Sequence, residues 1–476
     1  MGRNNRQRRA AKQKVRARHN HDHADSFVGP GHRASSTTSP TPPTTGQQAR
    51  VLLDRLLQWA RLGLSADDLT VRISIELSGQ QSETLVRLDE LASGALLQAA
   101  GPLWERGWQP RDLVHVAARL DKWAGALAAD LSVTHLHRSG RLEVAPESWH
   151  EQLEAARVRA QAAGIIHWST ESEWVAIDQL LTAGASAVPA WTSVIRLLAR
   201  MQGLPPLART LPPPSAWGNS AWGNTASQPP PRTNRSAPWS RPTTQGASGG
   251  NRDKVLTTIR ALLAKAESTQ FAAEAEALTA KAQAMMTKHA IDEALLHAGA
   301  EESVEVISRR ILIDNPYLVE KVQLLSEVGH ANRSKVVWMG DDYAMATVVG
   351  TPVDIDQVEL LFVSLLIQAT RAMAEAGAAR SGSFDRSPRF RRSFLTSYAI
   401  RIGERLAEAD AETTASYGSE LVPVLRRQEE AISAHYEELF PHTTQMSSRK
   451  TYDRRGWDAG RQAADQARFV QGRIAE

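Results

Sequence analysis

The chain has 476 residues, enough for two or three domains with an ample core. Its formal net charge is only +4 at pH 7, so the chain as a whole is not a polycation. It contains no cysteine, which excludes disulfide bonds, thiolate metal sites and a cysteine nucleophile. Neither a signal peptide nor a run of about 18 apolar residues is found, and we expect no membrane association and a cytoplasmic location.

The first segment, residues 1–46, is expected to be disordered. Its first 18 residues hold eight basic side chains and no acidic one, and residues 35–45 are rich in Ser, Thr and Pro. Such a segment buries too little apolar surface to offset the entropy lost on folding. A flexible basic arm binds polyanions without sequence preference, although a solubilising tail explains it equally well. The arm carries Arg3, Arg6, Arg8, Arg9, Lys12, Lys14, Arg16 and Arg18.

Residues 47–205 are expected to form a helical N-terminal domain. Leu52, Leu56 and Trp59 recur at helical spacing, and Pro110 is typical of the first turn of a helix. We expect a long helix from Pro110 to about residue 127. Further helices are expected at 147–163, 172–183 and 190–202. Residues 69–77 alternate between apolar and polar side chains, which is compatible with one strand.

Residues 206–250 read as a Pro-rich, disordered linker. The segment has three Pro-rich clusters and no acidic residue. It also carries the motif Ala-Trp-Gly-Asn twice, at 216–219 and 221–224. A plain linker accounts for this composition, and the alternative is a docking motif for a protein partner.

Two further units are expected after the linker. Residues 251–298 have the pattern of a helical hairpin, in which Leu263 and Leu278 should be buried where the helices meet. Residues 303–476 mix short alternating runs with long helical patterns, which indicates an α+β domain with a small antiparallel sheet covered by helices. The expected fold class is therefore predominantly α with an α+β C-terminal domain. Strands are expected at 304–313, 335–339 and 346–350, and helices at 317–329, 353–376, 389–411, 424–439 and 453–470.

The hairpin resembles a known family through residues 254–269 and 274–292, the latter containing Lys-Ala-Gln at 281–283 and Lys-His at 288–289. These segments are similar to the domain of unknown function 2786. That family has no assigned activity, so the resemblance implies a helical hairpin and no particular chemistry.

The regions on either side of the hairpin also resemble proteins that carry it. Residues 303–470 resemble the companion domain that follows the hairpin in bacterial and phage proteins, through 348–354, 359–373 and 392–398. Residues 47–205 resemble the helical extension of actinobacterial members, through 106–113.

Motifs for catalysis or for a cofactor are incomplete. His150 and Glu151 begin like a zincin motif, but residue 154 is Glu and no second His follows at the required spacing. The phosphate-binding glycine motifs and the nucleophile elbow are absent. We therefore predict no catalytic residue and no cofactor.

A metal site is also not expected. His19, His21 and His23 lie in the tail, where no fixed geometry exists. Four aspartates invite comparison with a hard-cation site, although a turn and a helix N-terminus explain them as well. They are Asp341, Asp342, Asp354 and Asp356.

Two sets of polar residues are candidates for binding. Glu274, Lys281 and Lys288 lie seven residues apart on one helix face, with Gln283 and His289 nearby, and a solvated face explains them equally well. The second set interleaves arginines with aromatic rings and so combines phosphate binding with stacking. It consists of Arg386, Arg389, Arg391 and Arg392 with Phe384, Phe390 and Phe394. The alternative for this set is that its rings face the core.

The basic segments favour a non-enzymatic, nucleic-acid-associated accessory protein. Two alternatives stay open: a hydrolase with its site between the hairpin and the α+β unit, and a scaffold that binds proteins. The sequence leaves the oligomeric state open.

Overall fold

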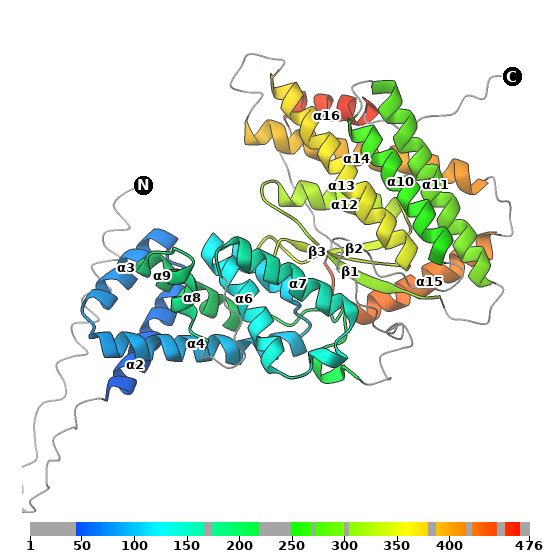
Figure 1. Cartoon of the computed structure of the whole chain (residues 1–476). Helices are drawn as coiled ribbons and strands as arrows, with labels where there is room; N and C mark the ends of the chain where they lie inside the picture. Colours follow the sequence, from blue (N-terminus) through cyan, green and yellow to red (C-terminus); the bar gives the residue numbers. More distant parts are fainter. Residues whose placement is uncertain are drawn as a thin grey trace, which may run out of the picture. The chain divides into compact units, whose positions relative to one another are not determined.

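The computed structural model describes residues 44–165, 174–218, 249–268, 272–298, 304–378, 387–415, 421–444 and 453–466. Within them the chain is predominantly α-helical, with one small antiparallel sheet (Figure 1). The expected disordered tail lies outside the described residues except for its last three positions, 44–46. Each helix in this described part is too short or too polar to cross a lipid bilayer.

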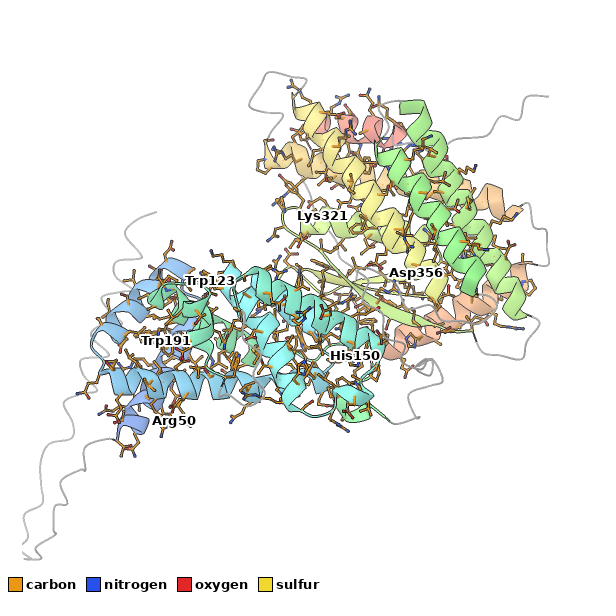
Figure 2. The ribbon with its side chains drawn as sticks, in the orientation of Figure 1. Arg50, Trp123, His150, Trp191, Lys321 and Asp356 are labelled. Atoms are coloured by element: carbon orange, nitrogen blue, oxygen red, sulfur yellow. The ribbon has the colours of Figure 1, made fainter. Side chains whose placement is uncertain are left out.

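The N-terminal region folds as a set of packed helices. A leucine stripe on the first helix, including Leu52 and Leu56, is buried against its neighbours. Trp191 on the last helix is also buried in this core (Figure 2). The helices are α2 (Thr45–Arg61), α3 (Ala66–Ser78), α4 (Ser82–Glu105), α5 (Pro110–Ala118), α6 (Lys122–Arg138), α7 (Glu147–Ala162), α8 (Ala176–Thr182) and α9 (Ala187–Gln202).

The long helix expected from Pro110 is two helices, α5 and α6. The chain leaves the helical path before Asp121, whose carboxylate accepts a hydrogen bond from the amide of Ala124 at 2.8 Å. An N-cap of this kind starts a new helix, because it satisfies a backbone donor that the helix itself leaves open. The apolar spacing continues across the break, which is why the pattern resembles a single helix.

The strand considered for residues 69–77 is wrong, because this segment is the helix α3. Ser65 caps it by accepting a hydrogen bond from the amide of Asp68 at 3.1 Å. Leu69 and Ile73 face the core, whereas Val71 and Ile75 are 59% and 66% exposed. Two apolar pairs with a spacing of four residues, one inside and one outside, produce the alternation that resembles a strand.

The beginning of the expected linker is packed against the helices. Leu207 and Trp217 are buried in the N-terminal core, and the ring of Trp217 lies 5.1 Å from that of Trp149. Residues 206–218 therefore differ from an extended linker, because their apolar side chains have core partners. Residues 219–248 of this segment lie outside the described residues.

The hairpin is formed by α10 (Gly249–Ser268) and α11 (Ala272–Ala298), which pack side by side (Figure 1). Leu263 is buried as expected, whereas Leu278 is only half-buried. The hairpin also packs against a later helix, since the Gln357 side chain donates to the carbonyl oxygen of Met286 at 2.9 Å. It is therefore part of a larger core.

The small sheet has the order β1-β3-β2, and both pairings are antiparallel, as expected. Its strands are β1 (Ile307–Leu312), β2 (Lys335–Trp338) and β3 (Met345–Gly350). The central strand β3 is buried throughout. The helices of this half are α12 (Leu318–Ala331), α13 (Pro352–Ala378), α14 (Pro388–Ala415), α15 (Leu421–Leu439) and α16 (Arg454–Gln466).

Candidate functional site

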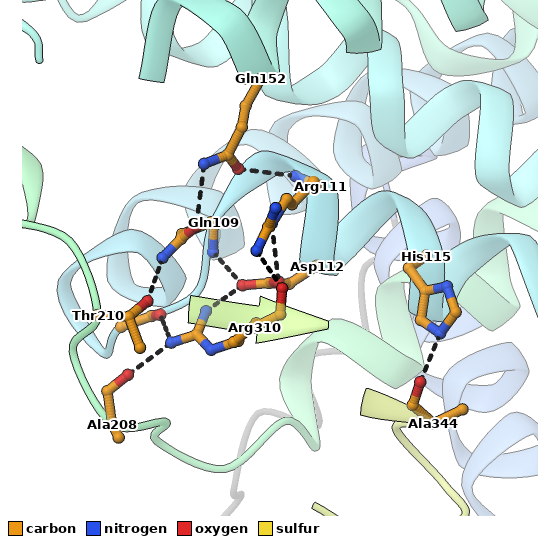
Figure 3. A network of polar contacts seen from close by, with 10 residues as sticks. Gln109, Arg111, Asp112, His115, Gln152, Ala208, Thr210, Arg310 and Ala344 are labelled. Atoms are coloured by element: carbon orange, nitrogen blue, oxygen red, sulfur yellow. Dashed lines mark hydrogen bonds and ion pairs between the residues drawn. The ribbon is translucent and has the colours of Figure 1, made fainter. Parts of the chain in front are cut away.

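A buried network around Arg310 joins β1 to the N-terminal helices (Figure 3). The Arg310 side chain is 1% exposed and forms an ion pair with Asp112 of α5. It also donates to the carbonyl oxygens of Gly107 at 2.7 Å and Ala208 at 2.5 Å. Asp112 in turn accepts the backbone N–H of Gln109 at 3.0 Å. The charge of Arg310 is compensated on several sides, so this network has a structural role.

Donors from the N-terminal helices also hold the β2–β3 turn. The His115 ring nitrogen lies 3.0 Å from the carbonyl oxygen of Ala344 (Figure 3). Arg119 and Arg200 donate to the carbonyl oxygens of Asp341 and Asp342, at 2.9 Å and 2.8 Å. Burial lowers the pKa of His115, although its hydrogen bond acts in the opposite direction. These contacts fix the position of the turn.

Two of the four aspartates weighed as a cation site pair with arginines through their carboxylates. Asp354 accepts hydrogen bonds from Arg333 at 2.8 Å and from Thr351 at 2.7 Å. Asp356 pairs with Arg309 of β1 at 2.8 Å. Over the part of the chain that the structure describes, no group of three or more His, Asp or Glu side chains could hold a metal ion. His150 lies exposed on α7 (Figure 2).

Arg333 organises a second buried cluster. Besides Asp354, it contacts Asp410 of α14 at 3.2 Å, and Asp410 also accepts a hydrogen bond from Thr287 of α11 at 3.3 Å. Burial alone lowers the pKa of Arg333, but the two carboxylates outweigh it and leave the pKa raised. The cluster ties the hairpin to α12, α13 and α14 and leaves Arg333 fully charged.

The polar residues considered for binding on the hairpin differ in their exposure. Lys281 and Lys288 are exposed, whereas Gln283 is 0% exposed and its amide has no hydrogen-bond partner among the described residues. His289 is half-buried, and the side chain of Glu274 lies outside the described residues. Gln283 follows Lys281 by two residues, which turns it about 200° around the helix and toward the core.

A different surface gathers unpaired positive charge. Helices α14 and α16 pack closely at two glycines: a Cβ on Gly456 would lie 2.4 Å from the Phe390 carbonyl oxygen, and one on Gly460 would lie 2.2 Å from that of Phe394. Both contacts advance by four residues along each helix, so the two helices run in the same direction. Their N-terminal ends therefore lie together, and these ends carry the positive pole of each helix dipole.

Five arginines lie at the N-terminal ends of these two helices, and we call them the arginine surface. They are Arg389, Arg391 and Arg392 of α14 and Arg454 and Arg455 of α16. All are exposed except Arg391, which is half-buried. Arg454 lies 4.0 Å from Asp458. The other four have no ion-pair partner within the described ranges, so their charge is available to a ligand.

The structure places the remaining predicted binding residues as follows. Phe390 and Phe394 are buried in the core, which is the alternative weighed for them, so they cannot stack on a ligand. Arg386 and Phe384 lie outside the described residues, as do Arg3, Arg6, Arg8 and Arg9 of the arm.

Sequence reasoning did not single out Arg454 and Arg455. They follow Asp453, whose carboxylate accepts the amide of Gly456 at 2.9 Å and so begins α16. A capping aspartate followed by two arginines was a readable signal for a basic helix start. The packing of that start beside the first turn of α14 has no local sequence signal.

Comparison with known proteins gives one match. Curated proteins yield no match to the chain, and solved structures yield none. Residues 254–293 match the model of a family described as a protein of unknown function, DUF2786. The matched segment covers most of α10 and α11, including the buried Gln283. The hairpin is thus similar to a family of proteins of unknown function.

Proposed function

We propose that this chain is a non-enzymatic, nucleic-acid-associated accessory protein that contacts phosphates through the arginine surface. The observation that carries the proposal is that four of the five arginines at two adjacent helix N-termini have no ion-pair partner among the described residues. An arginine guanidinium presents several N–H donors in a geometry that suits phosphate oxygens. Backbone amides at a helix N-terminus favour anions in the same way.

A concentration of like charge at two adjacent helix ends favours the binding of a polyanion. Several exposed arginines elsewhere in the described part of the chain are paired with an acid on the same helix, as in Arg87–Glu90 and Arg157–Glu154. The arginine surface differs from these helix faces because four of its five arginines have no such acidic partner among the described residues. Phosphate contacts of this kind fix a protein on nucleic acid without reading the base sequence.

The basic arm adds to the proposed binding. Its arginines, including Arg3, Arg6, Arg8 and Arg9, supply a second set of phosphate contacts. Because both sets act through charge, we propose binding to DNA and RNA without base preference. The proposed location is the cytoplasm, which the cysteine-free composition suits.

A direct binding measurement tests this proposal. The full-length protein is titrated into fluorescent duplex DNA and duplex RNA of the same sequence at low salt. We expect binding to both, and a similar loss of affinity for both when residues 2–18 are deleted. Absence of binding by the full-length protein at low salt would contradict the proposed function.

A further inference from the structure

The segment after the N-terminal helices contains a tandem repeat of five residues. Ser215-Ala-Trp-Gly-Asn219 is followed at once by Ser220-Ala-Trp-Gly-Asn224, with no difference between the two copies. The structure describes the first copy as far as Gly218. The structure therefore shows which residues of the N-terminal helices the repeated sequence contacts.

The first copy is held by contacts to two helices. Ser215 donates from its backbone N–H and its hydroxyl to the two carboxylate oxygens of Glu105, at 2.9 Å and 2.5 Å. Trp217 is 4% exposed, and its ring meets that of Trp149 edge to face at 5.1 Å between centroids. Gly218 has a φ of +81°, which a glycine adopts without strain. The serine, the tryptophan and the glycine of the first copy thus each contribute to its bound conformation.

The residues that contact the first copy belong to the N-terminal helices and not to the repeat. Glu105 ends α4, and Trp149 lies on α7, where its ring also packs against that of Trp104 at 6.2 Å. The three residue types that they engage recur five positions later, as Ser220, Trp222 and Gly223.

We propose that Glu105 and Trp149 form a peptide-binding site for the sequence Ser-Ala-Trp-Gly, and that residues 220–224 are its alternative occupant. The chain then has two registers, in which either copy of the repeat fills the site. Exchange changes the length of chain between the site and α10 by five residues, about 17 Å when extended.

The contacts also rank the two registers. Thr210 is anchored by Gln109 at 2.6 Å, and Pro213 and Pro214 are buried just before the first copy. When the second copy fills the site, the chain after Thr210 must loop out by five residues, and the two prolines lose their packing. The first register is therefore the major one, and the second becomes populated when the first is weakened.

Tryptophan substitutions test the exchange. Trp217→Ala removes the first occupant, and in this background Trp222→Ala should lower the urea midpoint of unfolding further, because it removes the second occupant. In the wild-type background Trp222→Ala should leave the midpoint unchanged. The matched control is Trp239→Ala, since Trp239 follows a proline and belongs to neither copy. The proposal is wrong if Trp222→Ala and Trp239→Ala have the same effect in the Trp217→Ala protein.

Disulfide trapping tests the exchange without removing a tryptophan. A Cβ on Gly218 would lie 3.9 Å from the Cβ of Val144, within the range of about 3.5–4.5 Å for disulfides. The chain has no other cysteine, so Val144→Cys can be paired with Gly218→Cys, Gly223→Cys or Ala226→Cys under oxidised glutathione. We expect a high yield for position 218, a lower but definite yield for 223, and only background for 226. Equal yields at 223 and 226 would overturn the second register.

Discussion

Asp89 on α4 illustrates how a buried carboxyl depends on its surroundings. One oxygen of its carboxyl group accepts hydrogen bonds from the Ser93 hydroxyl at 3.1 Å and the Ile177 amide at 3.3 Å. Burial is nevertheless the larger effect and raises the pKa of Asp89 to about 6. The folded state therefore binds a proton more readily than the unfolded state. The stability from Asp89 is fully present below the unfolded pKa of 3.8 and is lost as the pH rises through about 6.

Asp89→Asn is expected to stabilise the protein at pH 7.5, because the amide oxygen keeps the acceptor and cannot ionise. The gain should be about 3 kcal/mol, because the pKa shift from 3.8 to about 6 corresponds to about 1.4 kcal/mol per unit. At pH 4 the gain should largely vanish. Urea unfolding of both proteins at the two pH values measures it. An equal difference at pH 4 and pH 7.5 would show that ionisation of Asp89 is not the cause.

At the residue scale, the sequence alone could not show which polar side chains are buried and which are exposed. Arg389 and Arg392 could be proposed as exposed cations from their charge alone. The inward direction of Gln283 follows from its position two residues after Lys281, yet its lack of a partner depends on neighbours distant in sequence. Arg454 and Arg455 of α16 were missed because they form a basic surface only together with the start of α14, which is distant in sequence.

At the scale of elements, the close approach of α14 and α16 creates the arginine surface. It depends on glycine, since a Cβ on Gly460 would meet the Ser397 hydroxyl at 2.1 Å and the Phe394 carbonyl oxygen at 2.2 Å. A backbone carbonyl cannot rotate away, so the two helices would have to separate.

Gly460→Ala should lower the free energy of unfolding by about 1–3 kcal/mol, because it overpacks the helix contact. The control is Gly94→Ala in α4, where a Cβ would meet nothing within 4 Å. That substitution should stabilise by about 0.5–1 kcal/mol, since alanine favours a helix. Thermal unfolding of both variants checks the pair. A Gly460→Ala variant as stable as the wild type would refute the packing of α14 on α16.

Most elements could be predicted from their apolar period. The three strands, their antiparallel pairing and the C-terminal helices follow the sequence pattern to within a few residues. The error at α3 arose because two helical apolar pairs interleave into an apparent alternation. The packing of residues 206–218 could not be predicted from the sequence. A Pro-rich composition does not show that Leu207 and Trp217 pack into the N-terminal core.

At the scale of the whole molecule, the ion pair between Arg310 and Asp112 links residues 198 positions apart. Asp112→Ala would leave the Arg310 charge buried without a carboxylate. We expect a loss of about 3–5 kcal/mol in the free energy of unfolding. Glu154→Ala, which breaks an exposed pair with Arg157, should cost only about 0–1 kcal/mol. Similar losses in the two variants would show that Arg310 is solvated and that the network does not join the sheet to the helices.

The measurement that tests the central claim most directly is the salt dependence of duplex DNA binding by protein lacking residues 2–18. One variant replaces Arg389, Arg392 and Arg455 with Gln, and a matched control replaces Arg87, Arg157 and Arg371, each paired with a glutamate on its own helix. Both variants lose the same charge. If the arginine surface contacts phosphates, the first variant should flatten the slope of log affinity against log salt by about 2–3, at about 0.9 per lost contact, and the control should leave it unchanged. Equal slopes for the two variants would contradict a phosphate-binding surface at the ends of α14 and α16.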